Sequence, residues 1–139
     1  MKWLICFFSV SLLLSLGSCE KRIEKKFVGN YKGHYVFQDG YFIETGPEPY
    51  WQEVVTEGDQ MHTVYRDGDW LMVEGYGFKL ALKDMDMDGG AYSSYGGGHK
   101  SNTMVLSGNQ LQIKWSRCVA CQTSYRAFKY FEFIGTKVE

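Results

Sequence analysis

The sequence predicts an all-β domain: an up-and-down antiparallel meander of about eight or nine strands that closes as a β-barrel. Apolar and polar residues alternate over most of the chain after residue 26, two-residue turn signals separate the alternating runs, and no stretch shows sustained helical spacing. A meander of this length leaves two edge strands with unpaired backbone groups unless it closes, and closure is the usual solution. A two-sheet β-sandwich is the alternative.

The alternating runs and the turns between them define the expected strands. Gly, Asn and Asp supply the positive φ that hairpin turns need, so turns are expected at Asp39-Gly40, Gly58-Asp59, Asp67-Gly68 and Gly108-Asn109. The strands placed from these turns are 27–37, 41–45, 51–57, 60–66, 69–75, 77–83, 102–107, 110–117 and 123–135. Residues 84–101 are expected to form a long Gly/Ser/Tyr loop, and long loops in compact barrels are usually functional or mobile.

The N-terminal segment predicts export. Lys2 precedes an apolar run over residues 3–16 that is too short to span a bilayer and fits a secretory signal peptide. The "LGSC" that follows resembles the lipobox of bacterial lipoproteins. That resemblance implies that residues 1–18 are a lipoprotein signal peptide and that Cys19 carries acyl chains such as palmitate. We therefore expect a cell-envelope protein anchored in the lipid membrane, with an outer-membrane destination.

Residues 19–26 and residues 27–139 are expected to differ in organisation. The first segment is dense in charge and shows no periodicity, which predicts a short solvated tether. From Phe27 onward the chain holds 10 Lys and Arg against 14 Asp and Glu, without a basic stripe, so no nucleic-acid partner is expected. The second segment is expected to be the single β-barrel domain.

The start of that domain carries a second resemblance. In "GNYKG", Gly29 and one further residue precede the aromatic Tyr31, and this resembles the opening of lipocalin-like bacterial lipoprotein domains, whose aromatic residue plugs the barrel floor. The resemblance implies a lipocalin-like barrel with a cavity. Such a barrel can equally be filled by its own side chains. The expected cavity residues are Tyr31, Tyr35, Trp70, Trp115, Phe131 and Phe133.

The segment "DMDMDGG" raises the question of a metal site. Its alternate carboxylates and glycine match the first half of an EF-hand calcium loop, but Tyr95 stands where that loop needs a glutamate. Two interpretations remain open: a looser calcium site at Asp84, Asp86 and Asp88, or a solvated acidic turn, which we favour. No other cofactor is expected.

Cysteines and histidines offer few further candidates. Cys118 and Cys121 are expected to form a disulfide outside the cytoplasm, with a metal or redox role as the alternative to it. His34, His62 and His99 share no spacing and are expected at the surface or rim. Because the chain has no nucleophile elbow and no phosphate-binding glycine loop, we do not expect an enzyme.

These observations favour a membrane-anchored, non-catalytic binding module that holds a small apolar or aromatic ligand in its barrel. The alternative is a structural or interaction protein with a filled barrel, whose aromatic segment "AYSSY" contacts an envelope protein partner. Calcium could stabilise either version.

Overall fold

The computed structural model describes residues 19–43, 48, 50–96, 100–118 and 127–139, with the side chain of residue 43 left out. Over these residues the chain is all-β apart from an α-helix at residues 19–27 and one 3-10 turn, η1 (Leu82–Asp84). The eight strands are β1 (Gly29–Ile43), β2 (Tyr50–Asp67), β3 (Trp70–Val73), β4 (Lys79–Ala81), β5 (Gly89–Gly96), β6 (Lys100–Ser107), β7 (Gln110–Cys118) and β8 (Ala127–Val138).

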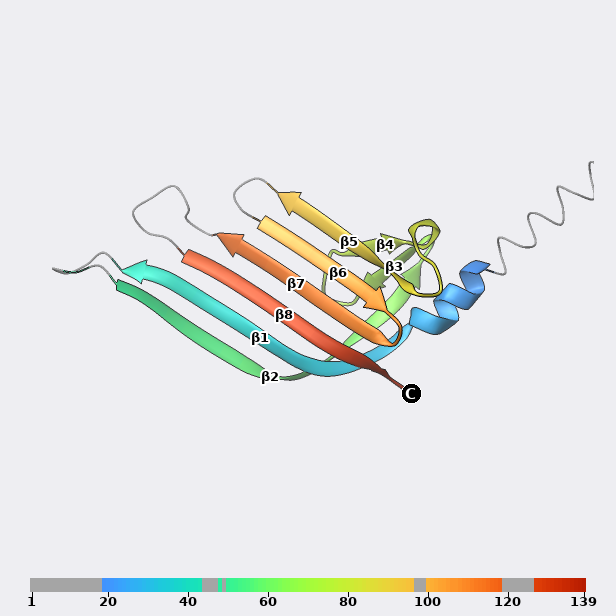
Figure 1. The fold of residues 1–139 in the computed structure, drawn as a ribbon, viewed down its shortest axis with the longest axis horizontal. Coiled ribbons are helices and arrows are strands. Elements are labelled where there is room, and N and C mark those ends of the chain that lie inside the picture. Colours follow the sequence, from blue (N-terminus) through green and yellow to red (C-terminus); the bar gives the residue numbers. More distant parts are fainter. Residues whose placement is uncertain (1–18, 44–47, 49, 97–99, 119–126) are drawn as a thin grey trace, which may run out of the picture.

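All strand pairs are antiparallel, in the order β4-β3-β2-β1-β8-β7-β6-β5. The up-and-down meander therefore curls into a nearly closed barrel whose two edges are β4 and β5, which confirms the predicted fold class. The two short strands β3 and β4 restrict closure to one end, because β2 pairs with β3 only through Val64–Asp67. Figure 1 shows β1, β2, β5, β6, β7 and β8 continuing beyond this closed end as an open, curved sheet.

The hydrophobic core fills the closed end. Alternate residues of each strand point inward, and the side chains with the least exposure come from opposite sides of the barrel. Tyr31 plugs the interior as expected, and its hydroxyl donates a 2.8 Å hydrogen bond to the carbonyl of Phe27. Burial raises the pKa of Tyr31 to about 12. The largest fully buried residues are Phe27, Tyr31, Val64, Leu71, Val73, Leu82, Met104, Leu106, Leu111, Ile113 and Phe133.

The helix at residues 19–27 packs on this closed end, so the prediction of a solvated tether is wrong. Ile23 and Phe27, four residues apart and on one helical face, are 2% and 0% exposed. Lys137 Nζ donates to the carbonyls of Lys25 and Lys26, at 3.2 and 2.9 Å, where the helix ends and carbonyls lack helical partners. Burial of this apolar face explains why a charged segment forms a helix.

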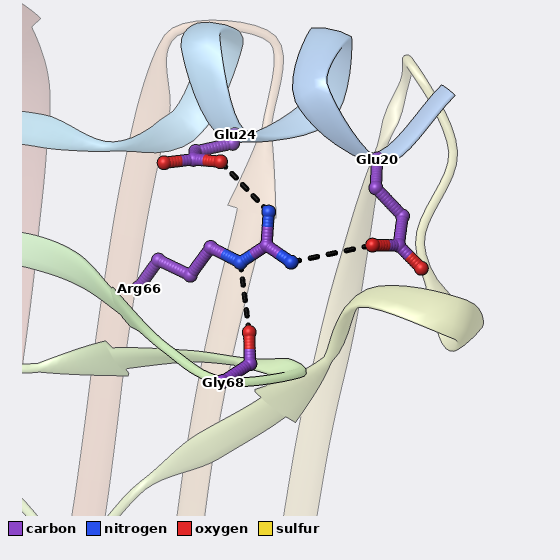
Figure 2. Close-up of polar contacts among 4 residues, drawn as sticks. All are labelled: Glu20, Glu24, Arg66 and Gly68. Carbon is purple, nitrogen blue, oxygen red and sulfur yellow. Dashed lines mark hydrogen bonds and ion pairs between the residues drawn. The ribbon is translucent and has the colours of Figure 1, made fainter. Parts of the chain in front are cut away.

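An arginine fork fixes the opposite edge of the helix (Figure 2). Arg66, near the end of β2, donates from Nη1 to Glu24 at 2.8 Å and from Nη2 to Glu20 at 3.2 Å. Its Nε donates to the carbonyl of Gly68 at 2.7 Å, which also ties the fork to the β2–β3 turn. Three directed contacts from one rigid guanidinium set the position of the helix relative to β2.

Two of the predicted turns are not turns. Gly40 lies inside β1 and Gly58 inside β2, so four of the nine expected strands are two long ones; with the unexpected β5 the total is eight strands. A Cβ added at Gly40 would lie 2.1 Å from the ring of Trp51, and one at Gly58 would lie 3.2 Å from Tyr35. Each glycine makes room for an aromatic ring from the neighbouring strand, which is another reason for glycine in a sheet.

The other two hairpin predictions are confirmed. Gly68 and Gly108 both have φ +59° and follow directly on β2 and β6. The expected loop at 84–101 is wrong, because residues 89–96 form β5 and pair with β6 along their whole length. Segment "AYSSY" is therefore part of an edge strand; Tyr92 packs against the core while Tyr95 is exposed.

The central strands β1 and β8 approach each other closely where Gly33 faces Gly135 across the ladder. A Cβ at Gly33 would lie 2.0 Å from the carbonyl oxygen of Ile134, and one at Gly135 would lie 2.4 Å from the ring of Phe133. Only glycine leaves room for this backbone contact and for the ring that folds over it.

We predict that Gly33→Ala destabilises the protein by about 2 kcal/mol or more, since backbone must move to admit the methyl group. Gly77→Ala is the matched control, because no atom lies within 4 Å of a Cβ there. Urea unfolding of both variants measures the difference. Equal stability of the two variants would contradict the close approach.

We also predict that Ile23→Ala lowers the free energy of unfolding by about 2 kcal/mol, as expected for truncating a buried side chain. Lys21→Ala, on the exposed face of the same helix, should change it little. Thermal melts of the two variants measure this. If both leave the melting temperature unchanged, the helix does not contribute to the core.

Candidate functional site

A pocket of about 490 Å³ opens on the inner side of the sheet. It lies at the rim of the closed end, just where β3 stops, since residues 74–76 follow β3 and form one wall. Residues from β2 form the second wall, and β7 and β8 contribute the floor. The lining residues are Gln60, Met61, His62, Thr63, Glu74, Gly75, Tyr76, Trp115 and Phe131.

The floor of the pocket is a run of stacked aromatic rings. Trp115 and Phe131, direct partners on β7 and β8, stack with centroids 5.7 Å apart and planes at 14°. On its other side Phe131 stacks on Tyr35 at 6.1 Å, and Tyr76 reaches it across the pocket at 6.1 Å. Trp115 in turn contacts Phe37 at 6.0 Å. Flat rings held by their neighbours offer a preformed apolar surface.

His62 is the one buried polar residue in the part of the chain that the structure describes. It is 6% exposed, and its ring is held edge-on by Phe133 at 4.5 Å and Tyr76 at 5.2 Å. Its Nε2 is buried and has no hydrogen-bond partner among the described residues. Burial lowers the pKa of His62, so the neutral imidazole is favoured at neutral pH. A buried nitrogen of this kind costs free energy unless something bonds to it.

The predicted cavity residues fall into three groups. Trp115 and Phe131 line the pocket, and Tyr35 supports them from behind. Tyr31 and Phe133 are fully buried core residues. Trp70 is misassigned: it is opposite in strand parity to the buried Leu71, is exposed, and stacks with Lys79, whose Nζ lies 4.8 Å from its ring.

Sequence reasoning missed the walls of the pocket. His62 was expected at the surface or rim: it does line the pocket at the rim, but at 6% exposed it is buried and not a surface residue. In "MHTVYR", the alternate set Met61, Thr63 and Tyr65 is the more apolar one, yet His62 and Val64 face inward. Val64 faces inward because it is the direct strand partner of the buried Val73, and this sets the inward orientation of His62 as well. The wall at 74–76 follows from where β3 stops, and no sequence motif marks it.

The aspartate segment forms an acidic turn into β5. Asp86 Oδ1 accepts hydrogen bonds from the backbone N–H groups of Asp88, at 2.7 Å, and Gly89, at 3.0 Å. Asp84 ends η1, and the three carboxylates do not converge; the described residues contain no group of three or more acidic, His or Cys side chains that could hold a metal ion. A Cβ at Gly89 would lie 1.9 Å from the carbonyl oxygen of Leu106, which accounts for the glycine.

The remaining candidates lie apart from the pocket. His34 is exposed and faces Glu57 and Asp59 on the outer side of the sheet. Cys118 is the last residue of β7, while Cys121 and His99 lie outside the described residues, so the disulfide stays a prediction. Cys19 is exposed at the start of the described chain.

No family model, curated protein or solved structure matches this chain. In the part of the chain that the structure describes, no helix is both long and apolar enough to cross a membrane. The fold defines the protein as an eight-stranded up-and-down β-barrel with an aromatic pocket at its rim.

The lowered pKa of His62 predicts a pH dependence of stability. The unfolded chain takes up a proton at an ordinary histidine pKa of about 6.5, whereas the folded state resists protonation, so stability falls as pH drops below that value. His62→Phe should make stability vary less between pH 7.5 and 5, at little cost at pH 7.5, because the aromatic packing is retained. Urea unfolding at several pH values measures both slopes. Identical slopes would show that His62 titrates normally.

Proposed function

We propose that this chain is a membrane-anchored, non-catalytic binding lipoprotein of the cell envelope that holds a small apolar or aromatic ligand. The observation that carries the proposal is the rim pocket, with its stacked aromatic floor and, beside it, the His62 Nε2, which has no hydrogen-bond partner among the described residues. The lining combines the aromatic floor with the polar side chains of Gln60, His62, Thr63 and Glu74, and a volume of about 490 Å³ lies in the usual range for small-molecule sites.

The anchor in this proposal is supported by the sequence and by the position of one residue. "LGSC" has the lipobox pattern, and Cys19 is exposed at the start of the described chain, where acylation meets no steric obstacle from the barrel. More than one acyl chain gives stable membrane attachment without a spanning segment. The outer membrane is the destination we propose.

A second candidate, a protein-interaction role, is favoured by the free edge of β2. From Tyr50 to His62 this strand pairs only with β1 among the described residues, so its outer edge can accept another strand. Its distal part also exposes apolar side chains: Tyr50, Trp51, Val54 and Val55 are 47–53% exposed. Exposed apolar groups beside an open edge are typical of contact surfaces.

Fluorescence titration with a neutral aromatic probe, N-phenyl-1-naphthylamine, tests the first candidate. We expect one probe to bind per folded protein, and Trp115→Ala to weaken binding about tenfold through loss of the stacked floor. Trp70→Ala is the matched control and should leave the affinity unchanged, since Trp70 is exposed outside the pocket. Thermal melts confirm that both variants are folded at the titration temperature.

Absence of saturable binding, or equal affinities of the two tryptophan variants, would reject the ligand-binding role. The free edge of β2 would then be the surface to examine.

A further inference from the structure

A row of three cations crosses the open part of the sheet on its inner face. Lys100 on β6 is the direct partner of Arg117 on β7, and Arg117 is the direct partner of Lys129 on β8. Arg117 stands two residues beyond Trp115 on the same strand, so both side chains project from the same face. Like charges placed directly opposite one another on a sheet repel, and this repulsion destabilises the sheet.

The charge of this row is only partly compensated. Lys129 Nζ lies 3.2 Å from Asp39 Oδ2, but neither Lys100 nor Arg117 forms an ion pair with any residue that the structure describes. In the sequence, no acidic residue lies between Asp88 and Glu132, while there are five Lys and Arg. In a chain with a net charge of −1, this concentration of positive charge is local.

The row continues the aromatic floor. The Arg117 guanidinium lies 5.5 Å from the ring centroid of Trp115, and Lys129 Nζ lies 5.9 Å from that of Phe37. Trp115 itself lines the pocket. Arg117 is two positions along the strand from Trp115, a distance of about 7 Å. An apolar surface therefore leads from the pocket directly to a set of cations, within the length of one small molecule.

We propose that the ligand of the rim pocket is an anionic amphipath, whose aromatic or acyl body lies on Trp115 and Phe131 and whose carboxylate, sulfonate or phosphate binds Arg117 and Lys100. This inference rests on the proposed ligand-binding function. A guanidinium is well suited to such an anion because its planar donors match two oxygens at once. The pocket itself, with a volume of about 490 Å³, has the size of a site for one small molecule.

Two probes that share one skeleton test the inference: neutral N-phenyl-1-naphthylamine and the anionic 1-anilinonaphthalene-8-sulfonate, which adds one sulfonate. Both are titrated into the folded protein at low ionic strength. For the anionic probe we expect Arg117→Gln to weaken binding about fivefold and the double variant with Lys100→Gln to weaken it further, as for partly exposed charge-assisted contacts. For the neutral probe the affinity should change less than about twofold, because the aromatic floor is intact.

Lys32→Gln is the matched control, since it removes the same charge from an exposed position on the opposite face of β1. It should leave both affinities unchanged. Arg117→Lys, which retains the charge, should recover most of the anionic affinity. Added salt should weaken the anionic probe alone.

Other outcomes would contradict either the anion-binding inference or the proposed function. If both probes bind and Arg117→Gln affects neither, the anion-binding inference is wrong and the ligand pocket stands. The inference also fails if Lys32→Gln weakens the anionic probe as much as Arg117→Gln, because net charge then explains the effect. If neither probe binds, the proposed function itself fails.

Discussion

The contact between Gly33 and Gly135 is the constraint on which the rest of the structure depends. It brings the backbones of β1 and β8 so close that no side chain fits between them, and it lets the ring of Phe133 fold over the strand beneath it. That ring packs edge-on against His62, which joins the wall of the pocket. The shape of the site therefore depends on the centre of the sheet, through the contacts of Gly135 with Phe133 and of Phe133 with His62.

The two ends of the sheet differ in structure because β3 and β4 are short: one end is a closed core and the other an open face. Where they are present, the barrel closes over a core that the helix at 19–27 completes with Ile23 and Phe27. Beyond them, the long strands carry aromatic rings and cations on a face with no opposing sheet (Figure 1). Stability is concentrated in one end, so that the other can expose groups that a closed core could not tolerate.

Alternation and turn chemistry were enough to predict an antiparallel barrel, and Gly108-Asn109 ends β6 as expected. They failed where glycine has a second use: Gly40 and Gly58 lie beneath Trp51 and Tyr35, a long-range contact that no local pattern reveals. The inward position of His62 was hidden for a similar reason, since the neighbouring Met61 and Tyr65 are more apolar yet point outward. Of the site, only the floor could be predicted, because Trp115 lies in a strand whose alternation is regular.

The arginine fork of Figure 2 has a mechanical consequence. In the proposed lipoprotein no flexible linker would separate the lipid from the barrel, because the helix at residues 19–27 is held to the barrel through Arg66 and Lys137. Acyl chains on Cys19 would then hold the barrel close to the membrane, at a distance of about one helix diameter, roughly 10 Å. The domain could rotate about this attachment point but could not move far from the membrane. Its open sheet would therefore keep a restricted set of angles to the membrane plane.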